Sequence, residues 1–155
     1  MDVATVLSAM QAGISAGFTS RGMPLGDIAI GGGRITNATV AHMGAFSPAI
    51  LLSCLRVSNL DLSGRDARAF DMGMGAYCIA AGNATDSGDI EVVRMVDYLM
   101  AGNQGILPGQ SWGLSECKAI EPGTIDARNL FAGSVSGMGI SLWAVTWLQH
   151  VFSTQ

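Results

Sequence analysis

The sequence predicts an α+β domain: a mostly antiparallel or mixed β-sheet with an N-terminal helix and a central helix packed on it, and a long C-terminal strand. Three observations lead to this prediction. Residues 139–152 form a long apolar run, residues 68–81 alternate between two side-chain faces, and two segments show the helical spacing of apolar residues. Neither a repeat nor a linker divides the chain, so we expect a single domain over residues 1–155.

The C-terminal run reads GISLWAVTWLQHVF. It is shorter than the roughly 18 apolar residues of a membrane-spanning helix, and it carries Gln149 and His150. As a strand it is largely apolar on both faces, which predicts that it is covered on both sides. We therefore expect the strand to lie in the core or in a subunit contact. The residues assigned to this closing strand and its core are Leu142, Trp143, Val145 and Trp147.

Two segments have the apolar spacing of amphipathic helices. Asp2 can cap the first helix, which should end near Gly17. Ser87 or Asp89 can cap the second helix, which should run to about Ala101. The predicted buried stripes are Val3, Val6, Leu7, Met10, Ile14 and Phe18 in the first helix, and Ile90, Val93, Val96, Leu99 and Met100 in the second. The second helix should turn Glu91, Arg94 and Asp97 to solvent.

Two long strands are expected between these helices. Pro48 opens the apolar run AILLSCLRVS, which ends at Asn59 and reads as a central strand. Residues 61–66 (DLSGRD) have the composition of a turn, and residues 68–81 read as a second long strand. One face of that strand holds Gly73 and Gly75, which would let a helix or a neighbouring backbone approach closely.

The remaining segments are weakly patterned. Residues 22–47 are rich in glycine and predict an extended loop with short strands around residues 27–30 and 36–42. Residues 114–120 read as a short strand, and residues 127–131 are ambiguous.

Composition favours a protein that buries extra surface in an assembly. Hydrophobic residues make up 49% of the chain and charged residues only 13%, with a mean hydropathy of +0.39. The net charge of −4 and the lack of any Lys/Arg run argue against a nucleic-acid groove, and no segment has the composition of a membrane span. Three widely spaced cysteines and no signal peptide indicate a reducing cytoplasm.

The sequence offers little reaction chemistry. The glycine-rich stretch GDIAIGGGR at residues 26–34 lacks the Lys-Ser/Thr ending of a phosphate-binding P-loop and the GxGxxG spacing of a dinucleotide site. His42 and His150 have no local motif that pairs either of them with a reactive cysteine, and no Cys or His spacing predicts a metal site. We therefore predict no catalytic residue, no cofactor and no metal.

From Pro48 onward, the order of segments forms a recognisable pattern. The segments are PAILLSCLRV, FDMGMGAYCIAAGN, SGDIEVVRMVDYLMAG, LSECKAIEPG, RNLFAGSVSGMG and ISLWAVTWLQHVF. Together with the N-terminal helix, they resemble the tail terminator (tail-completion) proteins of long-tailed bacteriophages, in particular the Mu-like group. LFAGSVSG and WAVTW match the closing part of the family pattern, whereas AAGN stands where the family has an ARN-like turn. The resemblance covers residues 1–20 and 48–152, and residues 22–47 match nothing in the family.

The resemblance implies a structural protein of the virion tail and neck that is assembled in the cytoplasm of the bacterial host. Family members form a homo-oligomeric, hexameric ring on the last ring of the tail tube. The ring ends tube polymerisation and joins the tail to the neck or connector protein of the head, and phage DNA passes through it without specific binding. The family has no catalytic or ligand-binding motif, so no such residue is carried over to this chain.

Two loops are the candidate contacts with the tube or the neck. Our hypothesis assigns this role to Gly31, Gly32, Gly33, Arg34 and Asn37 in the glycine-rich loop and to Asp61, Arg65 and Asp66 at the strand turn. Two alternatives stay open. The chain could be another head–tail connector or minor tail subunit, or a small cytoplasmic enzyme or ligand-binding domain that uses the glycine loop and the loop around Trp112.

Overall fold

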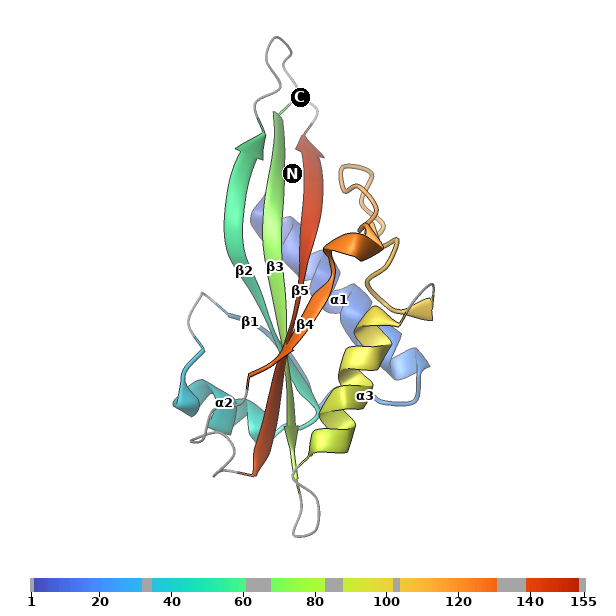
Figure 1. The fold of residues 1–155 in the computed structure, drawn as a ribbon. Coiled ribbons are helices and arrows are strands. Elements are labelled where there is room, and N and C mark those ends of the chain that lie inside the picture. Colours follow the sequence, from blue (N-terminus) through green and yellow to red (C-terminus); the bar gives the residue numbers. More distant parts are fainter. Residues whose placement is uncertain are drawn as a thin grey trace.

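The computed structural model describes residues 2–31, 35–60, 68–82, 88–101, 104–130 and 139–153. Within these ranges the chain forms a single α+β domain built on one five-stranded mixed sheet, which confirms the predicted fold class (Figure 1). Its elements in chain order are α1 (Val3–Ser20), β1 (Asp27–Gly31), α2 (Asn37–Gly44), β2 (Ala49–Leu60), β3 (Arg68–Ala81), α3 (Asp89–Met100), the 3₁₀ turn η2 (Pro122–Thr124), β4 (Asp126–Asn129) and β5 (Ile140–Ser153).

The sheet has the strand order β1-β2-β3-β5-β4. Only β1 and β2 pair in parallel, and all the other neighbours are antiparallel. The long strands β2, β3 and β5 form its centre, and β3 pairs with β5 along its full length, from Arg68↔Ser153 to Ala81↔Ile140. The predicted strand 68–81 is therefore confirmed at both ends, and the predicted strands 48–59 and 139–152 correspond to β2 and β5.

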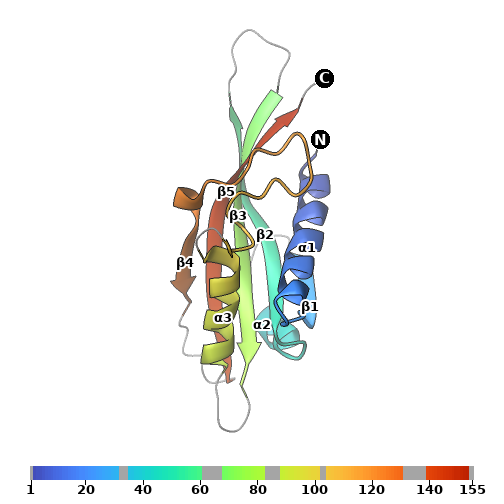
Figure 2. The ribbon, with the colours of Figure 1, turned by 90° about the vertical axis from the view of Figure 1, so that its right-hand side faces the viewer.

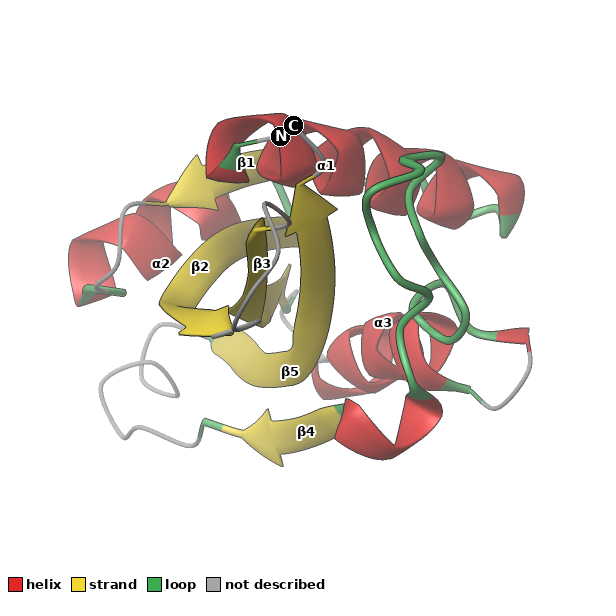
Figure 3. Cartoon of the chain, turned by 90° about the horizontal axis from the view of Figure 1, so that it is seen from above, coloured by secondary structure: helices red, strands yellow, loops and turns green. Residues whose placement is uncertain are grey.

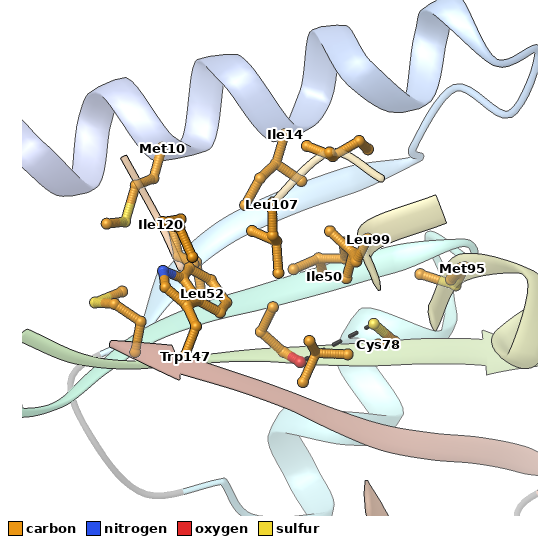
Figure 4. Close-up of a cluster of buried hydrophobic side chains, with 14 of the residues drawn as sticks. Met10, Ile14, Ile50, Leu52, Cys78, Met95, Leu99, Leu107, Ile120 and Trp147 are labelled. Carbon is orange, nitrogen blue, oxygen red and sulfur yellow. Dashed lines mark hydrogen bonds between the residues drawn. The ribbon is translucent and has the colours of Figure 1, made fainter. Parts of the chain in front are cut away.

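One face of the sheet carries the main hydrophobic core. The helices α1 and α3 run alongside the long strands on this face (Figure 2). Asp2 caps α1 as predicted, because its Oδ1 accepts the Thr5 backbone N–H at 2.7 Å. The stripe that α1 buries consists of Val6, Met10, Ile14 and Phe18. Figure 4 shows Met10 and Ile14 above Ile50 and Leu52 of β2, with Leu99 of α3 and Leu107 beside them.

The buried stripe of α3 differs from the predicted one. Val92, Met95, Val96 and Leu99 are buried, whereas Ile90 and Val93 are 68% and 43% exposed. Apolar residues occupy more than one side of this helix, so the sequence allows two stripes. The observed one has the i, i+3, i+4, i+7 spacing that packs best on the sheet. The prediction that Ile90 and Val93 are buried was therefore wrong.

The other face of the sheet is covered by α2, which lies on the opposite side of the strands from α3 (Figure 3). Residues 36–42 were predicted to form a strand. This prediction was wrong, because Thr36 caps α2 and the following residues belong to that helix. The Thr36 hydroxyl accepts the Thr39 backbone N–H at 3.1 Å and caps the helix. Val40 and Met43, three residues apart, then pack on Leu51 and Ile79 of the sheet. The expected strand at 27–30 is confirmed as β1.

Residues 114–120 do not form the predicted strand. Cys117 makes a single β-bridge to Val151, and two backbone hydrogen bonds, from Lys118 to His150 and from Phe152 to Glu116, bind this loop to the outer edge of β5. A buried polar contact holds the loop in place. The Trp112 indole N–H donates to Gln149 Oε1 at 2.9 Å, and Gln149 Nε2 donates to the Lys118 carbonyl at 2.7 Å.

The prediction that β5 is covered on both faces holds for only part of the strand. Leu142, Val145 and Trp147 are buried as expected, and Trp143 is half-buried. Toward the C-terminal end, however, the face opposite the main core is open. Leu148 is half-exposed there, and Phe152 is 41% exposed.

Candidate interaction surface

The second face of the sheet divides into two halves. The half under α2 is buried, and the other half lies at the end of β2, β3 and β5 farthest from α2 (Figure 1). We call this second half the open sheet face. By strand register its members are Leu55, Arg56 and Ser58 of β2, Asp71, Gly73 and Gly75 of β3, and Thr146, Leu148, His150 and Phe152 of β5.

A β-bulge shapes the β2 side of this surface. The register of β2 against β3 shifts between Cys54 and Arg56, so Leu55 is an extra residue on β2 and Arg56 pairs with Gly73. Leu55 is 48% exposed, and the Arg56 side chain is exposed beside it. The parallel pairing with β1 ends at Gly31↔Ser53, and no other described strand pairs with the outer edge of β2 beyond that point. The open sheet face therefore adjoins a free strand edge.

Gly73 and Gly75 lie on β3, the central strand of this surface. Neither has a positive φ. A Cβ at Gly73 would meet only ordinary contacts, the nearest being the Arg56 Cβ at 3.5 Å, whereas at Gly75 the Leu55 side chain lies 3.1 Å away. Because glycine weakens a strand and nothing in the described part of the chain requires it at Gly73, this position is typical of a site where another element approaches the backbone closely.

A polar pair lies across the open sheet face at its far end. His150 Nδ1 contacts Asp71 Oδ1, and the two side chains are 26% and 14% exposed. The register places Ser58 opposite Asp71, so the order across the strands is Ser58, Asp71, His150. A serine nucleophile needs the histidine between itself and the carboxylate. This arrangement puts the carboxylate in the middle and does not assemble a Ser–His–Asp relay.

The predicted loop contacts are only partly described. Gly31 is not in a loop but ends β1, where its carbonyl accepts the Ser53 hydroxyl at 3.2 Å. Asn37 is the first residue of α2. The other six predicted contacts lie outside the described residues: Gly32, Gly33, Arg34, Asp61, Arg65 and Asp66. Neither Gly31 nor Asn37 belongs to the open sheet face, although Gly31 ends where the free edge of β2 begins.

The cysteines lie in environments that suppress thiolate formation. Burial raises the pKa of Cys78 to about 12 and also raises the pKa of Cys54. The pKa of Cys117 is raised by burial and by the neighbouring Glu116 carboxylate. A thiol is a weak nucleophile unless it is ionised, so none of the three has the character of a catalytic cysteine.

Ligand chemistry finds little support in the described part of the chain. No three of its His, Cys, Asp or Glu side chains gather where they could hold a metal ion. Trp112, which was considered as a ligand platform, is buried and hydrogen-bonded to Gln149. His42 is exposed and packs edge-on against Phe46. Of the helices described, none is long and apolar enough to cross a membrane.

The open sheet face was not found from the sequence. A bulge leaves no sequence pattern, so Leu55 and Arg56 could not be assigned to this face in advance. The signals that could have found it were Gly73 and Gly75 in a strand interior and the apolar second face of β5. The glycines were interpreted as a place where a helix or a neighbouring backbone approaches closely, and the last strand was expected in the core or in a subunit contact, but neither prediction located this surface.

A scan against protein-family models finds no match to this chain, and a search of curated proteins finds no significant match. Function is therefore inferred from the surface and from the resemblance in the order and pattern of the elements.

Proposed function

We propose that this protein is a structural subunit of a bacteriophage tail. It forms a ring on the end of the tail tube, stops tube polymerisation and joins the tail to the head–neck complex. The proposal starts from the resemblance of the sequence pattern to the tail terminator family. The described order of α1, β2, β3, α3 and β5 is compatible with that pattern, while β1 and α2 lie in the segment that has no counterpart in it.

The observation that carries the proposal is the open sheet face. A sheet buried under helices on one face and under α2 on half of the other leaves apolar side chains such as Leu55 and Phe152 in water. Surfaces of this kind mark contacts with other proteins. The small share of charged residues, 13%, supports the same conclusion, because a subunit inside an assembly needs less charged surface.

Charge is compatible with a ring around DNA. The net charge of −4 and the lack of a Lys/Arg run disfavour tight binding to phosphates, so DNA could pass through the ring without being held. On this proposal the partners are further copies of the chain, the tail tube protein and a neck or connector protein.

Tube growth provides the direct test. Tail tube protein is polymerised with and without the purified protein, and the tubes are measured by negative-stain electron microscopy. We expect shorter tubes with a ring at one end. Tubes of unchanged length, with no bound protein, would contradict the proposal. Rings that ignore the tube but bind a purified connector would identify another head–tail connector subunit instead.

A loop deletion tests the predicted tube contact. Because Gly31 pairs with Ser53 in the sheet, we confine the deletion to Gly32 and Gly33. We expect normal folding by circular dichroism and weaker tube capping. A matched control is Arg128→Ala, which changes an exposed side chain on β4 outside the predicted contacts and should cap normally. A deletion that caps as well as the unaltered protein would remove this loop from the contact.

A further inference from the structure

We propose that the exposed side of α3 in one copy of this chain docks on the open sheet face of the next copy. This inference rests on the proposed ring and names its subunit contact. Two surfaces carry it, and both belong to the described residues. One is the open sheet face with Gly73 at its centre, and the other is the ridge of α3 defined by Ile90, Val93 and Asp97.

The ridge of α3 carries two apolar residues, Ile90 and Val93, where a solvent-facing helix side should be polar. Ile90 is 68% exposed and Val93 is 43% exposed, and Asp97 follows one turn after Val93. The three positions have the i, i+3, i+7 spacing of a single helix side. α3 already buries Val92, Met95, Val96 and Leu99 in its own core, so this ridge is a second apolar side with no partner in the described part of the chain.

The two surfaces cannot meet within one copy. α3 packs on the main-core face of the sheet near its α2 end, whereas the open sheet face lies on the opposite side and at the other end (Figures 1 and 3). A contact between them must therefore join two copies head to tail. Contacts of this kind are heterologous, and they produce a closed ring when the rotation between copies closes. A twofold dimer would need both surfaces of each copy to be used at once in one reciprocal contact, and their placement on opposite sides and at opposite ends of the sheet disfavours that arrangement.

The dimensions of the two surfaces agree. A helix of the length of α3, 12 residues, is about 18 Å long at about 1.5 Å per residue. The stretch of β3 from Asp71 to Gly75 on the open sheet face spans about 14 Å at about 3.4 Å per residue, and the next residue on this face, Tyr77, already packs with the residues under α2. The ridge from Ile90 to Asp97 is about 10 Å long at about 1.5 Å per residue, so it fits within this stretch. The neighbour's α3 would thus continue the helical layer that α2 begins on this face.

Charge favours the same pairing. Arg56 is exposed on the open sheet face, and within the described ranges it forms no ion pair. Its neighbour Asp71 is already paired with His150. The exposed residues of α3 include the Asp89 and Asp97 carboxylates and one guanidinium, that of Arg94. An acidic helix side therefore faces a surface whose unpaired charge is positive.

In this contact, the missing side chain at Gly73 would let the docking helix approach the sheet closely. Helices pack closely on a sheet where small residues let the backbones approach. The Cβ of a valine at this position would clear the Arg56 Cβ by an ordinary 3.5 Å, and valine favours strands, so the isolated subunit should tolerate Gly73→Val. The added branches would project toward the docking helix. One substitution should thus keep the fold and break the contact.

Mixing two variants tests the head-to-tail contact. Gly73→Val alters the open sheet face and leaves α3 intact, and the double change Ile90→Asp with Val93→Asp does the reverse. By native mass spectrometry we expect oligomers from the unaltered protein and monomers from each variant alone. An equimolar mixture should give heterodimers and nothing larger, because each variant keeps one working surface. Circular dichroism and thermal melts confirm that each variant is folded, and the helix variant alters only exposed side chains.

Charge reversal gives a second test that does not depend on Gly73. Arg56→Glu should weaken association at least tenfold, and Asp97→Arg in the other copy should restore part of it. Arg128→Glu is the matched control, since Arg128 is similarly exposed on β4 but lies on neither surface, and it should associate normally. Equal loss in the control, or no rescue by the double reversal, counts against the contact.

Several outcomes overturn the inference. These are an unaltered protein that stays monomeric at all concentrations, oligomers that persist in both surface variants, and a mixture of folded variants that yields no heterodimer. Tube capping is scored separately. If rings that depend on Gly73 fail to stop tube growth, the proposed function is wrong and the contact stands. If the protein caps tubes while Gly73→Val leaves its rings intact, the contact is wrong and the function stands.

Discussion

The two halves of the second sheet face are formed by the same three strands, β2, β3 and β5, but they differ in whether a helix covers them. Near Ala81 and Ile140 the face is sealed by Val40 and Met43 of α2. Toward the other end no described helix covers it, so Asp71 and His150 are partly exposed and Leu55 and Phe152 are exposed. Among the described residues, one short helix, α2, covers this face, and it is too short to cover the full length of the strands. The difference shows that an alternating strand pattern indicates an apolar face without specifying whether the same chain covers it.

The largest loss of stability is expected for a substitution in the main core, which provides the reference for both halves of the second sheet face. Trp147 is 3% exposed, and Trp147→Ala should lower the free energy of unfolding by about 3–5 kcal/mol. Its indole N–H is buried without a hydrogen-bond partner among the described residues, so Trp147→Phe should cost far less. Urea denaturation of both variants measures the difference. Equal losses would show that the N–H has a partner after all. Trp143→Ala should cost less than Trp147→Ala, because Trp143 is only half-buried.

Shortening one apolar side chain in each half of the second sheet face tests directly whether the two halves differ in burial. Met43 is 2% exposed under α2, and Met43→Ala should cost about 2–5 kcal/mol of unfolding free energy. Phe152 is 41% exposed on the open half, and Phe152→Ala should cost about 0.5 kcal/mol in the dilute monomer. Denaturant titrations at low protein concentration measure both. A large loss at Phe152 would mean that the open half is covered within the monomer.

A buried polar contact supports the loop that closes the edge of β5. Gln149→Leu keeps the approximate volume but removes the acceptor of the Trp112 N–H and the donor to the Lys118 carbonyl. We expect a loss of about 1–3 kcal/mol, since the Trp112 N–H would stay buried and unpaired. Hydrogen exchange should report faster opening of the loop at 110–118 and little change in α2. Uniform loss of protection across the sheet would contradict this local role.

The smallest effect concerns the thiols. In the folded protein at pH 8, Cys78 should resist alkylation, because burial raises its pKa from the usual 9.0 to about 12, whereas the half-buried Cys54 should react first. The same shift has a stability consequence. Above pH 9 the unfolded thiol ionises before the folded one does, so the stabilising contribution of Cys78 falls as the pH rises from 9 toward 12. Mass spectrometry of labelled peptides, with a denatured control, checks the order of reaction.

The sequence predicted the elements that have strong local patterns. Asp2 as a cap and the spacing of Met10 and Ile14 were enough for α1, and strict alternation fixed both ends of β3. It failed where two patterns competed. α2 lies in a glycine-rich stretch whose apolar residues show no clear periodicity, so the Thr36 cap did not indicate a helix. α3 has apolar residues on two sides, so packing decided which side is buried.

The candidate surface was harder to predict than the fold. Leu55 and Arg56 reach the open sheet face through a bulge that shifts the register of β2. Gly73 could be recognised as unusual in a strand, but the element that approaches it cannot be read from one chain. The loop residues chosen from the sequence, such as Gly31, were selected for turn composition, which shows where a chain bends and does not by itself show where it binds.

The pairing of β3 with β5 also has a consequence for how the chain reaches its native state. These two strands share the longest register in the sheet, yet α3, η2 and β4 all lie between them in the sequence. Bringing such distant segments together carries a large loop-closure entropy before any contact repays it, and folding rates fall as contacts become less local. Until β5 arrives, β3 keeps one edge unpaired and the hairpin that it forms with β2 exposes the apolar side chains of the future core. The slow step of folding is therefore expected to be the insertion of β5, and the period before it is when the chain is most prone to aggregate.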